Sequence, residues 1–470
     1  MQKSIGMQKN STLQKMNMEL KSSKKEKLFF SFGQVAVNIV WLLPGSFLTM
    51  YYTDSVGISA TFLGTMMLLA RLFDGFSDVL FGTILDKTRT KWGKARPWIL
   101  FMALPVVLSL IALFTVPTGI GDQATKIYVF TTYFIMTVVT YTVINIAVNA
   151  LLPRFSLTSQ DRAITTVIST IFALITILTL NMIIPSIIEK NGGFSSPHAW
   201  FIVVIAVGMV ALVGLLIAFF GIKERIPLEQ KPEQGEKSQT FSSIKMMLSN
   251  RYFILSLALF LANNILTGTQ SINLYYARDV FGDANLFGIM SLIGIAPMIL
   301  FMPFVPLFFK KFGKRNTICA GMIISAFALL LMLLNPTNTT WFFIFSLLRG
   351  IGSAPMTAAV GTLAGDVVDY NHWKTGVRKE GIAVSMQSIG AKLGTGIGSA
   401  LLGWILGWSG YNSLLAVQSE ATIRAMIIIC IVIPFIVSIL VFTLMLFWNI
   451  EKHQEEITEF IISQEIHEQS

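Results

Sequence analysis

Residues 71–98, RLFDGFSDVLFGTILDKTRTKWGKARPW, place ions inside an apolar run and then end that run in a basic turn. Arg71, Asp74 and Asp78 follow one another at intervals of three and four residues, so on a helix they project from one face. A charged side chain at the bilayer centre costs about 2.5 kcal/mol or more, so such ions face the protein interior or a wet cavity. The stretch therefore predicts a membrane-spanning helix with a functional charge cluster.

The composition of the whole chain also places it in a lipid bilayer. Of 470 residues, 54% are hydrophobic and 13% are charged, and the mean hydropathy is +0.68, whereas a soluble domain carries roughly 25% charged residues. The net charge of +10 comes from Lys and Arg in short clusters between apolar runs, which indicates membrane topology, and we expect no nucleic-acid partner. The two cysteines, Cys319 and Cys430, lie in apolar runs and are expected to be packing residues.

Apolar runs long enough to cross a membrane recur along the chain. A helix needs about 20 residues to cross a hydrocarbon core of about 30 Å, and a continuous apolar run of this length is helical because lipid offers no partner to a free backbone. We count twelve such runs, at about 29–53, 58–86, 97–117, 126–153, 163–188, 199–221, 252–279, 285–309, 317–335, 340–368, 381–408 and 424–449. The first run lacks a small-residue cleavage site, so we expect it to be retained.

The polar segments between these runs orient the chain and divide it. Basic residues gather in alternate segments, from the N-terminal tail to the 310–315 cluster, so both termini are predicted to be cytoplasmic. The longest polar segment separates two six-helix halves, which is the architecture of the major facilitator superfamily. The predicted parts are a basic cytoplasmic tail (1–28), an N-terminal bundle (29–221), a cytoplasmic central loop (222–251), a C-terminal bundle (252–449) and a cytoplasmic C-terminal tail (450–470).

The charge cluster of residues 71–78 has two interpretations. One arginine cannot neutralise two carboxylates, which favours an acidic site for a cation, either Na+ bound by oxygen atoms or a proton on a carboxyl group. The alternative is structural, with Arg71 pairing one aspartate and fastening helices together.

Two further ions lie within apolar runs. Lys392 is about twelve residues into the eleventh run, near mid-depth, and its natural partner is Asp74 or Asp78; the alternative is that it extends to one membrane interface. Arg349 lies about nine residues into the tenth run, where it either binds a negatively charged substrate or pairs with a carboxylate for structure.

Two motifs carry a resemblance to a known family. YYTDSVGIS with RLFDGFSDVLFGTILDKTRTKWGKARPW, and GDVVDYNHWKTGVRKEGIAVSMQSIGAKLG at 365–394, resemble the glycoside-pentoside-hexuronide:cation symporter (melibiose permease-like) family over about residues 29–450. The resemblance implies a cation site at Asp74, Asp78, Ser77 and Thr142, with Lys392 and Arg71 as charge partners. It also implies a cytoplasmic gate at Asp366, Asp369 and Arg378.

The substrate positions depart from the melibiose permease pattern. Asn38, Asn145, Asn149, Thr170 and Thr357 stand where that protein has aspartates, an arginine and two tryptophans. Carboxylate and arginine forks bind sugar hydroxyls strongly and a tryptophan face stacks on the ring, so we expect a substrate other than an α-galactoside. If Arg349 faces the pocket, a uronide or another acidic glycoside is expected.

These observations predict an all-α membrane protein that imports a glycoside, pentoside or uronide together with Na+ or H+ across the bacterial plasma membrane. No cofactor is expected. The alternative on the same fold is a cation-coupled carrier of a lysolipid or drug-like amphiphile. Catalysis is not expected, because all four histidines lie in loops or the tail and the cysteines lie in unrelated runs.

Overall fold

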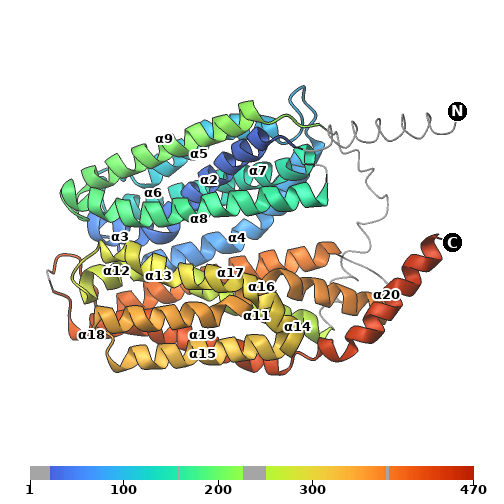
Figure 1. Cartoon of the computed structure of the whole chain (residues 1–470). Helices are drawn as coiled ribbons and strands as arrows, with labels where there is room; N and C mark the ends of the chain where they lie inside the picture. Colours follow the sequence, from blue (N-terminus) through green and yellow to red (C-terminus); the bar gives the residue numbers. More distant parts are fainter. Residues whose placement is uncertain (1–21, 157, 226–249, 377–379, 416, 470) are drawn as a thin grey trace. The chain divides into compact units, whose positions relative to one another are not determined.

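The structure is a computed structural model, and it describes residues 22–156, 158–225, 250–376, 380–415 and 417–469 (Figure 1). Within these ranges the regular structure is helical, apart from an isolated bridge between Thr90 and Gly93. The predicted all-α class is confirmed.

The helices follow the predicted apolar runs closely. The first half of the chain holds α2 (Lys24–Ser46), α3 (Leu48–Met50), α4 (Ala60–Lys87), α5 (Arg96–Leu113), α6 (Asp122–Phe134), α7 (Thr142–Phe155), α8 (Ser159–Lys190) and α9 (Pro197–Gly221). The second half holds α11 (Arg251–Gly268), α12 (Ile272–Tyr275), α13 (Leu286–Phe301), α14 (Val305–Phe312), α15 (Lys314–Leu334), α16 (Thr339–Thr375), α17 (Glu380–Trp408), α18 (Glu420–Ile427), α19 (Ile433–Leu446) and α20 (Gln454–Gln469). Short π-helical or 3-10 turns extend several of them: η1 (Tyr51–Val56), η2 (Ile135–Tyr141), η3 (Tyr276–Val280), η4 (Met302–Phe304), η5 (Ile428–Val432) and η6 (Ile450–His453).

Eleven helical segments of the described chain are long and apolar enough to cross a membrane. Each coincides with one of the predicted runs. The remaining run, 58–86, is α4, whose 28 residues extend about 42 Å at 1.5 Å per residue. Arg71, Asp74 and Asp78 lie inside it.

The chain forms two compact units. The first contains the described residues of Met1–Tyr51 and Phe76–Lys231, and the second contains Tyr52–Gly75 together with those of Pro232–Ser470. The first part of α4 therefore belongs with the C-terminal helices. Most of the predicted central loop, residues 226–249, lies outside the described residues, so the predicted bundle boundaries stay a prediction.

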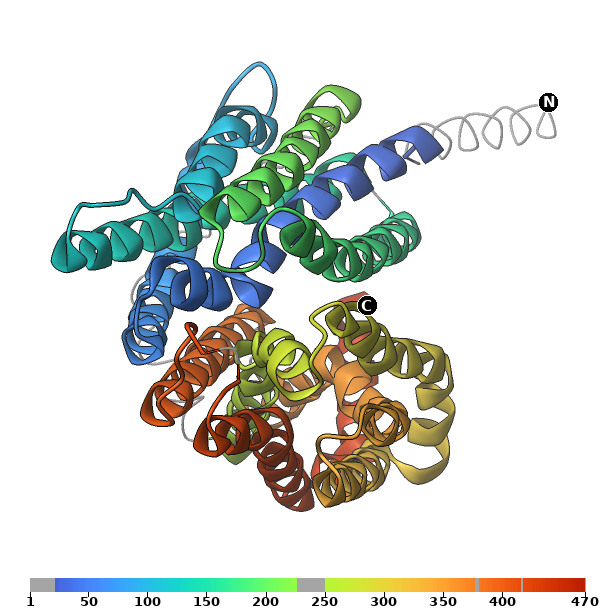
Figure 2. The same ribbon diagram turned by 90° about the vertical axis from the view of Figure 1, so that its left-hand side faces the viewer.

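Aromatic packing closes one end of the first unit. α2 lies against α8 and α9, and α5 also lies against α9 (Figure 2). Trp200 at the start of α9 is fully buried and contacts Phe47, Tyr51, Phe114 and Phe194. Its indole N–H donates to the Phe194 carbonyl at 2.8 Å, which satisfies the polar atom of the ring.

Close helix contacts in the second unit depend on glycine. A Cβ at Gly390 of α17 would lie 2.8 Å from the Phe260 Cβ of α11, and a Cβ at Gly64 of α4 would lie 2.9 Å from the Ala400 carbonyl of α17. Small residues let helix backbones approach in a membrane, where no hydrophobic effect drives helices together. α17 is thereby held between α11 and the first part of α4, which places the ions of α4 and α17 within reach of each other.

Outward-facing apolar side chains are numerous. On α5, Phe101, Leu104 and Leu108 are each more than half exposed and share one face of the helix. A continuous apolar face of this kind is unfavourable in water and suits contact with lipid chains.

Candidate cation and substrate sites

Asp74 is buried between two cationic side chains. Arg71 lies one turn before it on α4, and the Arg71 Nη1 to Asp74 Oδ2 distance is 3.1 Å. Lys392 comes from α17, with its Nζ 3.4 Å from Asp74 Oδ1 and donating to the Asp74 carbonyl oxygen at 2.7 Å. The structure thus brings together the carboxylate and both predicted charge partners. Their ion cluster joins α4 to α17 inside the second unit.

The local sequence of α17 makes room for this cluster. Gly396 follows Lys392 by one helical turn, and a Cβ there would lie 3.0 Å from the Arg71 Cβ. The Arg71 stem therefore passes over a position that has no side chain. Both Arg71 and Asp74 are less than a tenth exposed, so their attraction is weakly screened.

The other predicted cation ligands belong to the first unit. Ser77 Oγ donates to Thr142 Oγ1 at 3.4 Å, and both side chains are buried. Thr142 follows the π-helical turn η2, and its hydroxyl donates to the Thr137 carbonyl at 3.3 Å. Asp78 is half-buried, one turn beyond Asp74 along α4. Hydroxyl and carboxylate oxygens are the ligands that hard cations prefer.

The predicted substrate residues of the N-terminal half form an amide chain. Asn149 Nδ2 donates to Asn145 Oδ1 at 2.9 Å, and Gln34 Nε2 donates to Asn149 Oδ1 at 2.9 Å, which links α7 to α2. Asn38 lies one turn after Gln34 and donates to its carbonyl at 2.7 Å. Thr170 on α8 is exposed and donates to the Thr166 carbonyl, outside this chain of bonds. Asn38, Asn145 and Asn149 thus share two neighbouring helices.

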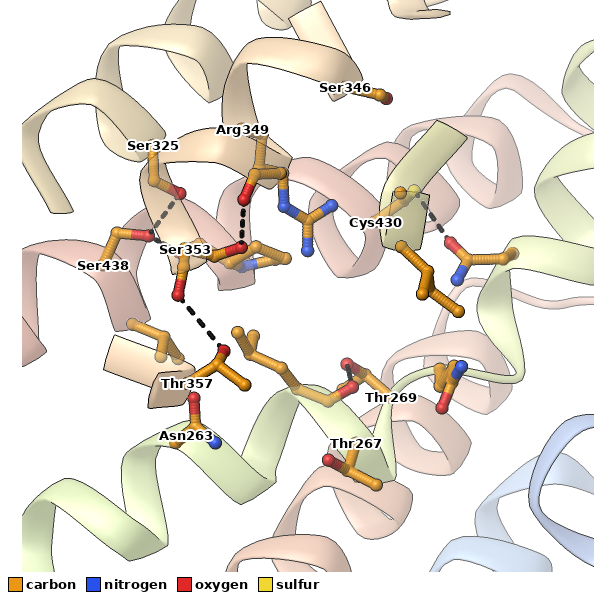
Figure 3. Close-up of a pocket in the computed structure, with 18 of the residues that line it drawn as sticks. Asn263, Thr267, Thr269, Ser325, Ser346, Arg349, Ser353, Thr357, Cys430 and Ser438 are labelled. Carbon is orange, nitrogen blue, oxygen red and sulfur yellow. Dashed lines mark hydrogen bonds between the residues drawn. The ribbon is translucent and has the colours of Figure 1, made fainter. Parts of the chain in front are cut away.

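Arg349 and Thr357 line one cavity of the second unit. This cavity has a volume of about 300 Å³ and lies among α11, α13, α15, α16, η5 and α19. The Arg349 guanidinium points into it, with Ser353 and Thr357 one and two turns further along α16 (Figure 3). The Thr357 hydroxyl donates to the Ser353 carbonyl at 3.1 Å. The cavity wall around Arg349 carries polar side chains, among them Ser346 and Ser353.

The predicted gate is described in part. Lys314 at the start of α15 donates to both carboxylate oxygens of Asp366 at 2.7 Å. Asp369 lies three residues further along α16 and is half-buried. Arg378 lies outside the described residues. Asp366 is about 40 Å along a 37-residue helix, beyond the thickness of a hydrocarbon core, so this ion pair lies toward one membrane surface.

A second buried ion cluster was not predicted. Asp54 of η1 forms an ion pair with Arg278 of η3. Tyr411 donates to Asp54 at 2.8 Å and accepts from Arg278 at 2.6 Å. Arg278 also donates to both carboxylate oxygens of Asp279, at 2.8 and 2.9 Å. Burial, with the neighbouring Asp54 carboxylate, raises the pKa of the Tyr411 phenol, which keeps the hydroxyl protonated as a donor.

An internal repeat was the available signal for this cluster. YYTDSV at 51–56 and YYARDV at 275–280 lie at the ends of the first and seventh predicted runs, and π-helical turns cover Tyr51–Val56 and Tyr276–Val280. Matched tyrosines followed by ions at equivalent places in the two halves are the kind of internal repeat that transporter folds carry. The Asp54 side chain is 2% exposed and the Arg278 side chain is 21% exposed, so the cluster is buried at the carboxylate and half-buried at the guanidinium.

A second repeat concerns the basic turns. Glu224, just after α9, accepts from the backbone N–H groups of Lys94, Ala95 and Arg96 at 2.8–2.9 Å, and so caps the start of α5. In the second half, Glu451 accepts from the Arg315 N–H at 2.8 Å at the start of α15. Gly93 and Gly313 precede these starts with φ values of 106° and 80°, a left-handed conformation that glycine adopts without strain.

The arginines of these turns also match. Arg96 donates to the Phe219 carbonyl near the end of α9, at 2.8 and 3.2 Å. Arg315 donates to the Leu446 carbonyl at the end of α19, at 2.7 Å. The same arrangement therefore occurs in both halves of the chain. In each half, a carboxylate and an arginine link the third membrane-spanning helix to the sixth.

Repeated helical halves, a polar cavity and buried ions at mid-membrane depth define the class as a multi-pass membrane transporter. The chain belongs to the MFS/sugar transport protein family, whose model matches residues 29–452. It is a transporter rather than an enzyme.

The curated relatives are bacterial transporters. The isoprimeverose transporter of Lactiplantibacillus pentosus is 29% identical over 91% of this chain and 89% of its own length. The glucuronide carrier protein homolog of Escherichia coli (strain K12) is 30% identical, over 84% of this chain and 86% of its own length. The putative sulfoquinovose importer of the same organism is 27% identical over 87% of both. This protein is accordingly a plasma-membrane protein.

Solved structures share the fold at low sequence identity. The nucleoside transporter NupG matches with a TM-score of 0.63 at 16% identity, covering 90% of this chain and all of that one. The inward-open xylose transporter XylE from E. coli matches with a TM-score of 0.63 at 12% identity, covering 88% of this chain and 94% of that one. These likenesses support the major facilitator fold.

Proposed function

We propose that this protein imports a glycoside, pentoside or uronide together with a monovalent cation, Na+ or H+, by alternating access, with both termini in the cytoplasm. The observation that carries the proposal is the buried Asp74 carboxylate, which lies about 21 Å along α4 and is held by Arg71 and Lys392. Ions at such depth in a membrane protein are retained for function by default, because their burial is costly.

The cluster suggests how a cation would change the conformation. A cation that binds beside Asp74 weakens its attraction for Lys392, because both are single positive charges at one carboxylate. The Asp74–Lys392 contact joins α4 to α17, so cation binding loosens one helix contact and favours another arrangement of these helices. Coupling then requires only that each ligand raise the affinity for the other, typically by 1–3 kcal/mol.

The relatives support a sugar as the substrate. They are named as an isoprimeverose transporter, a glucuronide carrier homolog and a putative sulfoquinovose importer. The amides of Asn38, Asn145 and Asn149 and the polar cavity beside Arg349 offer many hydrogen-bonding groups. Such groups suit a polyhydroxylated molecule, since each sugar hydroxyl both donates and accepts.

The test measures coupling in proteoliposomes. Wild-type protein and the variants Asp74→Asn and Asp78→Asn are compared for accumulation of labelled glycosides, pentosides and uronides under an imposed Na+ or H+ gradient, and for exchange without a gradient. We expect both variants to lose accumulation and to retain exchange, because only the driven step needs the cation. Full accumulation by both variants would remove these carboxylates from coupling.

Asp122→Asn is the matched control. Asp122 is an exposed carboxylate in the first turn of α6, paired with Lys126 at 2.6 Å. An exposed pair of this kind contributes about 0.5 kcal/mol or less, so this variant is expected to accumulate substrate as the wild type does.

A further inference from the structure

We propose that the cavity of the second unit is a subsite for the acidic group of the substrate, in which Arg349 binds the single negative charge of a sugar acid. This inference rests on the proposed transport function and names the substrate class of that transporter. Of the two roles that the sequence left open for Arg349, the proposal chooses substrate binding over structural pairing.

The charge of Arg349 is not balanced by the protein around it. Among the described residues that line the cavity, Arg349 is the one charged side chain, and no Asp or Glu is present. No ion pair or hydrogen bond joins its guanidinium to another described residue. Arg349 is half-buried at the cavity wall. A cation held in the protein interior without a partner is unfavourable, and an anion entering the cavity would reduce that cost.

The depth of Arg349 suits a transported ligand. It lies ten residues into α16, or about 15 Å along the helix, near the middle of a hydrocarbon core of about 30 Å. Transporters of this architecture bind substrate near the midplane. The guanidinium points toward the centre of the cavity (Figure 3), so a carboxylate there can accept two parallel hydrogen bonds.

The rest of the lining suits the hydroxyl groups of a sugar. Asn263, Gln270 and Asn273 of the lining carry amides that donate and accept. The Ser353 and Thr357 hydroxyls donate to carbonyls of their own helix and keep lone pairs for a ligand donor. A volume of about 300 Å³ is at the small end of ligand pockets, which fits about one sugar ring with a small substituent.

The single positive charge in the cavity limits the charge of the acid that it can bind. A phosphate ester carries about 1.5 to 2 negative charges at pH 7 and is usually met by several cations or by a helix N-terminus. Here a single guanidinium faces the space, and it is matched in charge by one carboxylate or one sulfonate. We therefore infer a monoanion such as a uronate, and not a sugar phosphate.

Cys430 allows a direct electrostatic test. Cys430 lines the same cavity, and it becomes the single cysteine of the chain in a Cys319→Ser background. Labelling rates are compared for the anionic 2-sulfonatoethyl and the cationic 2-aminoethyl methanethiosulfonate. We expect Arg349→Gln to lower the anionic-to-cationic rate ratio about tenfold, and Arg349→Lys to preserve it.

The matched control for labelling removes a charge elsewhere. Arg251 lies at the start of α11, is exposed and stacks on Tyr252, outside the cavity. Arg251→Gln is expected to leave the rate ratio unchanged. An unchanged ratio in Arg349→Gln, or a Cys430 that neither reagent reaches, overturns the proposal, because the cavity would then not attract or admit an anion.

A binding experiment identifies the substrate class. Calorimetry with purified protein in Na+ compares methyl glucuronide with methyl glucoside, and methyl galacturonide with methyl galactoside. We expect a uronide to bind more tightly than its neutral partner. Arg349→Gln should weaken the uronide by about 30-fold or more while changing the neutral sugar by less than about threefold. Equal weakening of both members of each pair, or a preference for the neutral member, overturns the proposal.

The two proposals fail in different ways. Accumulation of a neutral sugar alone, still dependent on Asp74, overturns the acid subsite and leaves cation-coupled transport in place. Binding of a uronide through Arg349 without accumulation in any ion gradient supports the subsite and overturns symport. If no sugar binds at all, the labelling ratio at Cys430 still decides whether the cavity selects anions.

Discussion

Tyr411 joins the buried Asp54 carboxylate to the half-buried Arg278 guanidinium. Its hydroxyl donates to Asp54 and accepts from Arg278, so Tyr411→Phe removes two hydrogen bonds without changing the ring. We expect a loss of about 1–3 kcal/mol in unfolding free energy, because two hydrogen bonds to charged groups are lost in a largely buried place. Thermal unfolding of the purified protein measures the change.

The control for this prediction is a double-mutant cycle with Asp54→Asn. If Tyr411 acts through Asp54, the double variant is less destabilised than the sum of the two single variants, by about 0.5–3 kcal/mol. Additive effects would contradict a shared network.

The two ion clusters differ in how far sequence reasoning reached them. Lys392 was predicted to pair with Asp74 or Asp78, because an ion in the middle of an apolar run has few possible partners other than another such ion. Asp54 and Arg278 lie at helix ends, where a charged side chain is ordinarily solvated. Their burial follows from a contact between residues separated by 224 positions, which no local pattern specifies.

The role of Arg349, which lies deeper in the membrane, could not be predicted from the sequence either. The sequence indicated an arginine inside a membrane helix and left open whether it serves substrate or structure. Its role depends on whether a neighbouring helix supplies a carboxylate. Only the packing of the helices determines this, and the described residues that line the cavity include no carboxylate.

The helices α4 and α17 approach each other closely at positions that lack a side chain. A Cβ at Gly64 would lie 2.9 Å from the Ala400 carbonyl, a backbone atom that cannot rotate away. We expect Gly64→Ala to destabilise the protein by about 1–3 kcal/mol and to impair transport, since it separates the helices that carry Asp74 and Lys392. Thermal unfolding and uptake in proteoliposomes measure the two effects.

Gly82 provides a control on the same helix. A Cβ there would meet nothing within 4 Å. Gly82→Ala should be neutral or stabilising by up to about 1 kcal/mol, because alanine favours helix. Equal destabilisation by both substitutions would mean that close contact is not the reason for Gly64.

Helix starts are the second feature at this scale. Glu224 accepts three backbone N–H groups at the start of α5, so Glu224→Ala leaves three donors without their acceptor. We expect a loss of about 2 kcal/mol in unfolding free energy, at the upper end of capping effects. Glu451→Ala should act in the same direction in the second half, through Arg315.

The matched control is a carboxylate that caps nothing buried. Glu420 lies in the first turn of α18, is exposed and pairs with Arg424 at 3.0 Å. Glu420→Ala should cost about 0.5 kcal/mol or less. A comparable loss in Glu420→Ala and Glu224→Ala would contradict a special role for the Glu224 cap.

Helix positions were predicted well and helix irregularities were not. Each predicted run overlaps an observed helix over most of its length, because a bilayer allows few alternatives to a continuous apolar helix. The π-helical turns, such as η2 before Thr142, were not anticipated. One extra residue in a turn changes neither composition nor apolar length, and it arises from packing against neighbours.

At the scale of the whole transporter, charge balance makes a prediction about the driving force. A monoanionic sugar acid that moves with one monovalent cation carries no net charge across the membrane. We therefore expect uronide uptake to follow the cation gradient and to be insensitive to a potassium diffusion potential, since only a transported charge responds to voltage. Uptake in proteoliposomes at fixed gradient and varied potential measures this.

A neutral sugar provides the comparison. Its cotransport with the same cation moves one positive charge inward, and an inside-negative potential should then accelerate it. Voltage-dependent uronide uptake would contradict the assumed balance of one cation to one acid, because about 2.3 kcal/mol per 100 mV acts on each uncompensated charge.

The carboxylate that caps α5 has a consequence for synthesis of the chain. Glu224 leaves the ribosome 130 residues after Lys94, which at bacterial rates is a delay on the order of ten seconds. Until then the first turn of α5 has no acceptor, and the same order recurs between Arg315 and Glu451, 136 residues apart. In each half of the nascent chain, the hydrogen bonds from the start of the third helix to this glutamate can therefore form only after the sixth helix has been made. A ribosome that pauses before either glutamate would hold a half whose third helix is still unsecured.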